Sequence, residues 1–168
     1  PNTIIFHKLI NSSTCTKTIF FILIDLLKLL IICIIILCCT IFNFSSEQGK
    51  TSSSTSAKVA SFLIDIFNNG KEMSILEKNV QIEILQPFVR KGAHFSIYML
   101  LGILSMCCAQ TFNWNNVCKF NTSTIFVFLY ACTDELHQKF VSGRSGKFAD
   151  VCLDTIGAAC GILIILAI

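Results

Sequence analysis

The residues of this chain that could do chemistry lie mostly in its second half. Two of its histidines, His94 and His137, could act as general acids or bases near neutral pH. Asp134 and Glu135 could take the same role if partial desolvation raised their pKa. These four side chains would suit an enzyme that transfers protons.

Other residues would suit the binding of an anion. Arg144 could hold a phosphate or a carboxylate through two parallel N–H groups, with Lys91 as an additional point charge. Asp150 and Asp154 would then orient these cations. Residue types alone therefore leave both an enzyme and a binding protein open.

The sequence does not predict a metal site or a cofactor. A divalent metal held by His94, His137 and carboxylates is conceivable, but the segment at 134–138 is not an HExxH motif. The 10 cysteines include no CxxC pair and no regular spacing, so we interpret most of them as small apolar residues at helix interfaces. A net charge of +3 is too small to indicate a nucleic-acid partner.

The elements that must position these residues are predicted to be membrane-spanning helices. Hydrophobic residues make up 54% of the chain and charged residues only 14%, and the mean hydropathy is +0.71. Runs of about 20 apolar residues match a hydrocarbon core of roughly 30 Å. We therefore predict an all-α, multi-pass protein of the cell membrane, with a polar segment at 1–18 and a transmembrane domain at 19–168. The spans of this bundle of about four helices are expected near 19–44, 91–110, 122–140 and 150–168.

The segment between the first and second spans is predicted to lie outside the membrane core. Residues 45–58 are rich in Ser and Thr and indicate a loop. Apolar residues at mixed three- and four-residue spacing then predict two short amphipathic helices, Val59 to Phe67 and Met73 to Leu85. Pro87 should end the second one.

Helical spacing places the polar residues on defined faces. The expected stripes are Lys91, His94 and Tyr98; Asp134, His137 and Gln138; and Asp150, Asp154, Gly157 and Gly161. The last stripe combines two carboxylates with a GxxxG spacing, which lets a neighbouring helix approach closely. The carboxylates should therefore face the bundle and not the lipid.

Alternating spans would bring these stripes together at one end of the bundle. The end of the first and third spans and the start of the second and fourth then share one membrane face. The candidate polar site consists of Arg90, Lys91, His94, Tyr98, Asp134, Glu135, His137, Gln138, Arg144, Asp150 and Asp154. Ionisable clusters inside membranes usually mark functional sites, although a layer of structural ion pairs would use the same residues.

The order and spacing of these motifs resemble the VanZ-like membrane protein family over residues 35–165. The matching segments are Phe44-Ser45, Arg90-Lys91-Gly92-Ala93-His94-Phe95, Asp134-Glu135-Leu136-His137-Gln138-Lys139-Phe140, Gly143-Arg144, and the aspartates at 150 and 154. Lys139 is a departure, since the family often has a less charged residue there. The resemblance implies a bacterial cell-envelope protein, because the founding member is associated with low-level resistance to teicoplanin, a lipoglycopeptide.

Three functions follow as hypotheses. The chain could bind an anionic or lipid-linked envelope molecule and so contribute to teicoplanin tolerance, with membrane lipids and a lipid-linked cell-wall precursor or the lipoglycopeptide as partners. It could instead be an intramembrane enzyme that modifies a cell-wall precursor. In the third hypothesis it is a scaffold whose charge layer only fixes the fold. Alanine substitutions would discriminate these classes, since a scaffold should lose stability where a site loses only function.

Overall fold

The computed structural model describes residues 2–68 and 73–168, with side chains described from residue 18 onward. The described residues form five helices and no strand, which confirms the all-α class. The helices are α1 (Asn2–Ser46), α2 (Gly49–Phe67), α3 (Ile75–Gln110), α4 (Asn116–Gln138) and α5 (Phe148–Ala167).

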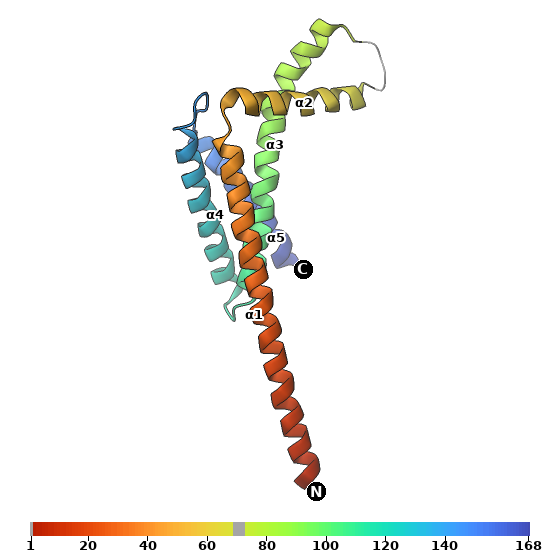
Figure 1. Ribbon diagram of the computed structural model, residues 1–168, viewed down its shortest axis with the longest axis vertical. Coiled ribbons are helices and arrows are strands. Elements are labelled where there is room, and N and C mark those ends of the chain that lie inside the picture. The colour runs from red at the N-terminus through yellow and green to blue at the C-terminus, as the bar shows by residue number, and fades with distance from the viewer. Residues whose placement is uncertain (1, 69–72) are drawn as a thin grey trace.

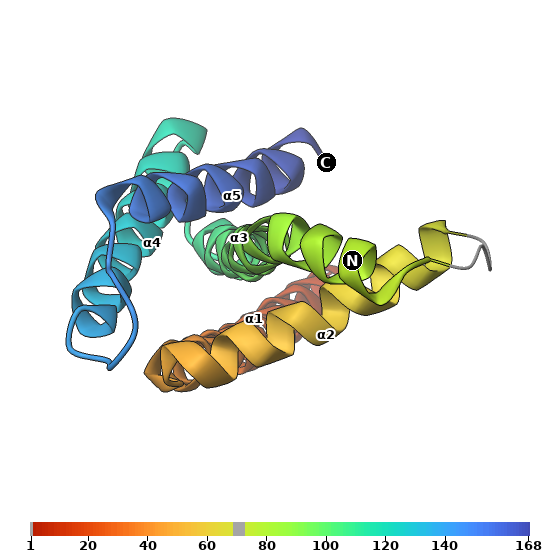
Figure 2. The same ribbon diagram turned by 90° about the horizontal axis from the view of Figure 1, so that it is seen from above.

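Four of the helices run along a common direction and the fifth crosses their end. Figure 1 shows that α1 runs toward the end of the bundle where α2 lies, that α3 returns from it, and that α4 and α5 repeat this alternation. Seen along the bundle, α3 lies between α1 on one side and α5 on the other (Figure 2). It packs against α1, α2, α4 and α5, and is therefore the central helix.

Three of the described helices are long and apolar enough to cross a membrane. They are the Thr18–Ser46 part of α1, α3 and α5. The α1 segment buries almost none of its apolar side chains against the rest of the protein, which suits a surface in contact with lipid. The protein is thus a membrane protein, as the sequence predicts, but the predicted fourth span near 122–140 is not confirmed. This region belongs to α4, where polar residues at 121–124 and 133–135 flank a short apolar stretch.

The predicted loop at 45–58 is wrong over most of its length, because α2 already begins at Gly49. Several hydroxyls in this segment donate to carbonyls one turn earlier, Thr55 to Thr51 and Ser56 to Ser52, and are satisfied within the helix. The buried positions Ser56, Ala60 and Ile64 form one stripe, and α2 packs on α3. Tertiary packing therefore overrides the low helix propensity of Ser and Thr.

The second predicted amphipathic helix does not exist as a separate element. Ser74 and Glu77 form a capping box, and α3 then continues from Ile75 to Gln110 through Pro87. The carbonyl that Pro87 leaves without its usual N–H partner belongs to Glu83, which is exposed and can be hydrated. The first turns of α3 consequently project beyond the bundle, as Figure 1 shows.

The α3–α5 interface is a contact between backbones. A Cβ atom added at Gly157 would lie 2.5 Å from the carbonyl oxygen of Phe95, and one added at Gly161 would collide with the carbonyl of Met99. The close approach expected from the GxxxG spacing is therefore present. It brings the start of α5, with its two aspartates, against the polar part of α3.

Candidate functional site

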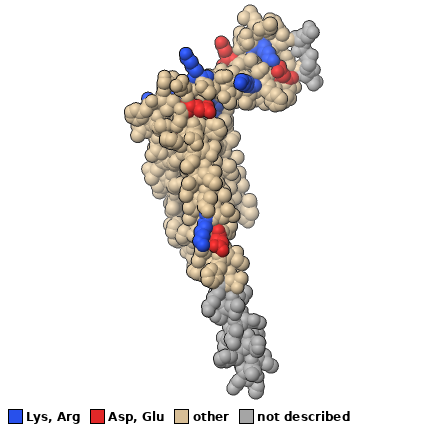
Figure 3. Space-filling model, in the orientation of Figure 1, with Lys and Arg blue, Asp and Glu red and all other residues tan. Residues whose placement is uncertain are grey.

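Charged side chains gather at one end of the molecule. On the face shown in Figure 3, blue and red surface concentrates around α2 and the adjoining ends of the other helices, while most of the bundle below is uncharged. This is the end at which α1 and α4 finish and α5 begins (Figure 1). The structure thus brings polar residues of several helices to one end, although not all of them into one site.

A buried hydrogen-bond network joins polar side chains of three helices at this end of the molecule. Tyr98 of α3 is 0% exposed, and its hydroxyl donates to Asp134 Oδ2 of α4 over 3.1 Å. The side-chain amide of Gln138 donates to the same oxygen over 3.2 Å. The Gln138 amide also reaches Ser45 Oγ of α1 at 3.4 Å. Asp134 is therefore fixed by α3 and by its own helix, and this network links α1, α3 and α4.

Beside this network lies a group of one imidazole and two carboxylates. His94 Nδ1 of α3 stands 3.8 Å from Asp154 Oδ2 of α5. One ligand-type atom from each of His94, Asp134 and Asp154 lies within 4.8 Å of the other two. Both oxygens of Asp154 and Oδ1 of Asp134 are buried without a hydrogen-bond partner among the described residues. Buried polar atoms in this condition are uncommon and need an explanation.

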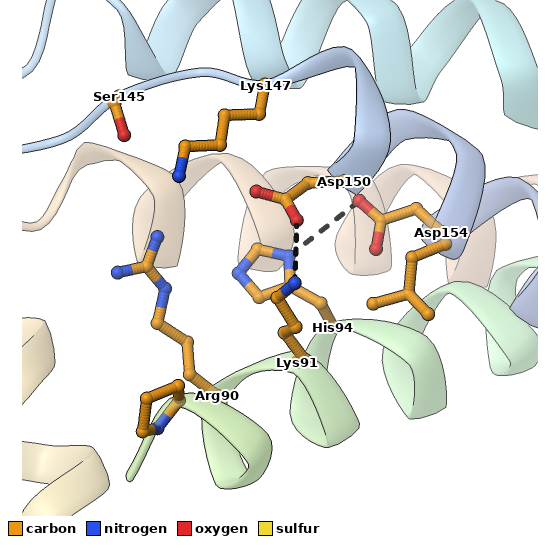
Figure 4. A pocket seen from close by; sticks show the side chains of 9 residues that line it. Arg90, Lys91, His94, Ser145, Lys147, Asp150 and Asp154 are labelled. Carbon is orange, nitrogen blue, oxygen red and sulfur yellow. Dashed lines mark ion pairs between the residues drawn. The ribbon is translucent and has the colours of Figure 1, made fainter. Parts of the chain in front are cut away.

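A first cavity, of about 200 Å³, opens next to this group. Lys91 and Asp150 form an ion pair across it at 3.7 Å, as Figure 4 shows. Arg90 and Lys147 point toward the same side of the cavity in that view. Its lining consists of Pro87, Arg90, Lys91, His94, Ser145, Lys147, Asp150, Leu153 and Asp154.

A second cavity, of about 230 Å³, lies between the end of α1, α2 and α3. Two arginines, Arg90 and Arg144, supply positive charge to it, and Glu47 supplies one carboxylate. The remaining wall is largely apolar and includes Ile41 and Ile97. Arg90 and His94 line both cavities.

Arg144 is placed by the turn between α4 and α5. Gly143, directly before it, has a φ of +76°, which only glycine adopts without strain. Arg144 Nη2 donates to the carbonyl of Phe44 at the end of α1 over 2.8 Å, whereas its Nε and Nη1 are buried and meet no acceptor in the described part of the chain. Burial and the nearby charge of Arg90 lower the pKa of Arg144, but a guanidinium remains charged at neutral pH.

Two predicted site residues have other contacts. Glu135 Oε2 accepts the backbone N–H of Lys147 over 2.8 Å, so Glu135 holds the start of α5. His137 stacks on Phe42 of α1 with ring centroids 4.4 Å apart, and its Nε2 lies 3.1 Å from Ser46 Oγ. His137 is not part of the group that contains His94, so the two histidines do not converge as the metal hypothesis required.

Sequence reasoning missed residues that complete the site. Ser45, the Phe44 carbonyl and Glu47 come from the end of α1, and Ser145 and Lys147 from the turn before α5. The Phe44-Ser45 motif was a usable signal. The Phe44 carbonyl, in contrast, could not be predicted to bind Arg144, because every residue type has a backbone carbonyl.

Comparison with known protein families agrees with the motif pattern. A family model described as VanZ/LLP1 matches residues 30–168, which is most of the chain and includes every residue of the candidate polar site. The resemblance expected from the sequence is thereby confirmed. No curated protein and no solved structure matches.

Proposed function

This chain belongs to the VanZ/LLP1 family, and we propose that it binds the phosphate or carboxylate group of an anionic, lipid-linked envelope molecule in the bacterial cell membrane. The observation that carries the proposal is the state of Arg144. Two of its three guanidinium nitrogens are buried and unpaired among the residues that the structure describes. Buried N–H donors without an acceptor are costly, and a bound anion would supply the missing acceptors.

The cavity beside Arg144 has the two-sided character that a lipid-linked anion needs. Arg90 and Arg144 would meet the charged group, while Ile41, Val59 and Ile97 would contact an apolar chain. Because Ile41 and Ile97 belong to α1 and α3, the ligand would lie against two helices that are long and apolar enough to cross a membrane. A small soluble anion would leave this apolar wall unused.

We further propose that α4 is the fourth span of a multi-pass protein. Its 23 residues would reach about 35 Å at 1.5 Å per residue, which is enough for the hydrocarbon core. Its polar residues Ser123, Asp134 and Gln138 are buried inside the protein, so they would not meet lipid. Its direction alternates with that of α3 and α5 in Figure 1.

Binding can be measured with dodecyl phosphate as the probe and dodecanol as the uncharged match. The full chain, purified in a neutral maltoside detergent, should bind dodecyl phosphate and not dodecanol in a calorimetric titration. We expect Arg144→Ala to weaken binding more than tenfold. The affinity of Arg144→Lys should lie between those of wild type and Arg144→Ala, because lysine keeps the positive charge but lacks the planar, two-pronged guanidinium group. Lys58→Ala, which removes an exposed cation outside the cavity, is the matched control and should bind normally.

The link to teicoplanin requires a test in cells. A deletion strain complemented with Arg144→Ala should be more susceptible to teicoplanin than one complemented with wild type, at equal membrane levels of the two proteins. Equal susceptibility of the two strains would rule out the proposed role in teicoplanin tolerance. Anion binding would then be judged by the calorimetric titration alone. Loss of the variant from the membrane would instead favour the scaffold hypothesis.

A second candidate function is an intramembrane enzyme that modifies a cell-wall precursor. The observation that favours it is the contact of His94 with the buried Asp154 at the edge of two cavities, an arrangement suited to general acid–base chemistry. Turnover of a lipid-linked precursor by wild type but not by His94→Gln would establish it. Binding without turnover would favour the first candidate.

A further inference from the structure

We propose that His94, Asp134 and Asp154 form a binding site for one divalent metal ion, of the class that includes Mn²⁺ and Zn²⁺. The three residues come from α3, α4 and α5, so the ion would join three helices. This inference does not depend on the anion-binding proposal, since Arg144 is not among the three residues.

The distances are close to those of a metal site. Three donor atoms at about 2.1 Å from one ion stand roughly 3.4–3.6 Å from one another in a tetrahedral or trigonal arrangement. The candidate atoms of His94, Asp134 and Asp154 lie within 4.8 Å of each other. Side-chain adjustments of up to about 1 Å would therefore bring all three donor atoms within reach of one ion.

Charge is the second argument. Asp154 is 0% exposed and Asp134 is 3% exposed, so two carboxylates share a region from which water is largely excluded. Both Asp154 oxygens and Asp134 Oδ1 have no hydrogen-bond partner within residues 18–68 and 73–168. A cationic His94, protonated on both ring nitrogens, could offset one negative charge, whereas a divalent ion would offset both and satisfy the unpaired oxygens.

The surroundings orient the ligands in a way that suits a metal. Asp134 Oδ2 is occupied by hydrogen bonds from Tyr98 and Gln138, which leaves Oδ1 without a partner among the described residues and available to an ion. Such outer hydrogen bonds normally fix metal ligands in place. His94 presents Nδ1 toward Asp154. Three protein ligands leave at least one coordination position open, and the first cavity, lined by both His94 and Asp154, provides access to it.

The donor set indicates the kind of ion. One imidazole and two carboxylates suit Zn²⁺ or Mn²⁺, while Mg²⁺ and Ca²⁺ prefer oxygen alone. The first test should use Mn²⁺, since the chain contains 10 cysteines whose thiols would take up Zn²⁺ elsewhere. The competing explanation is a proton shared between the two aspartates, which would need no metal.

The decisive experiment is metal content. The full chain, purified without a histidine tag, is stripped with EDTA, dialysed against micromolar Mn²⁺ in maltoside detergent and analysed by mass spectrometry of the metal. We expect about one Mn²⁺ per chain, and at least tenfold weaker uptake by Asp154→Asn. The matched control is Asp65→Asn, which changes an exposed carboxylate of α2 outside both cavities and should retain the ion. Wild type that retains no ion, or an equal loss in both variants, would overturn the proposal in favour of a shared proton.

A spectroscopic readout covers the case in which Asp154→Asn does not fold. Pulsed electron paramagnetic resonance of the Mn²⁺-loaded wild type should show one imidazole nitrogen bound to the ion. The nitrogen signal should disappear in His94→Gln and persist in His137→Gln, because His137 packs against Phe42 instead. A bound ion without a nitrogen ligand, or a signal that depends on His137, would contradict the site.

Discussion

At the scale of single residues, Asp134 connects the buried hydrogen-bond network to the candidate metal site. One of its oxygens receives two hydrogen bonds and the other receives none among the described side chains. Because Oδ2 is held by two hydrogen bonds, the carboxylate is fixed in orientation and Oδ1 is the oxygen free to bind a further group. Residues that hold Asp134 should therefore affect both stability and function.

The hydroxyl of Tyr98 offers a direct test of that network. Tyr98→Phe removes a buried hydrogen bond to a carboxylate, which typically costs about 1.5–3 kcal/mol. Thermal unfolding in detergent, followed by circular dichroism, should show a clearly lower midpoint. The matched control is Tyr130→Phe, which removes a half-buried hydrogen bond to the neutral Cys38 carbonyl and should cost less, about 0.5–1.5 kcal/mol. An equal or larger effect at Tyr130 would contradict a stronger contribution of the Tyr98–Asp134 hydrogen bond to stability.

At the scale of elements, the α3–α5 contact determines where the aspartates of α5 lie. Gly161→Ala would place a methyl group against the Met99 carbonyl and push the helices apart. We expect a lower unfolding midpoint and weaker Mn²⁺ uptake, because Asp154 would move away from His94. Gly92→Ala is the matched control: nothing lies within 4 Å of its added Cβ, and Ala is about 1 kcal/mol better than Gly in a helix. If Gly161→Ala behaved like Gly92→Ala, the close packing would not position the site.

The same scale shows what could be predicted from the sequence. Long apolar runs identify the membrane-spanning parts of α1, α3 and α5, and the GxxxG spacing predicts a close helix contact, for which the structure supplies α3 as the partner. The Ser/Thr segment and Pro87 misled the prediction, because local propensity says nothing of the α3 surface on which α2 packs or of the exposed side where Pro87 lies. The spacing also grouped His137 with Asp134, although only the structure reveals that His137 packs against α1.

At the scale of the whole molecule, α2 closes one side of the second cavity. Its position depends on a close approach between Gly49 and Gly143, where a Cβ on Gly49 would collide with the Gly143 carbonyl, and on a hydrogen bond from the Gly49 N–H to Ser142 at 3.1 Å. This contact joins α2 to the turn that carries Arg144.

Gly49→Val should therefore weaken dodecyl phosphate binding without changing any group that lines the cavity. The side chain would displace α2 and the Arg144 turn from one another, and we expect a several-fold rise in Kd by calorimetry, with helix content by circular dichroism unchanged. Gly92→Val, at an open helical position, controls for the cost of a β-branched residue. Normal affinity of Gly49→Val would mean that α2 contributes little to the binding cavity.

Because Arg90 and His94 belong to the walls of both cavities, the two proposed ligands would be thermodynamically linked. A cation held at His94 adds positive charge beside the anion cavity and should increase its affinity. Reciprocity then requires the anion to tighten Mn²⁺ binding by the same factor. Each ligand can be titrated in the presence and in the absence of the other, which connects the free, singly bound and doubly bound protein in one thermodynamic cycle. The factor by which Mn²⁺ lowers the Kd of the anion then fixes the factor by which the anion should lower the Kd of Mn²⁺.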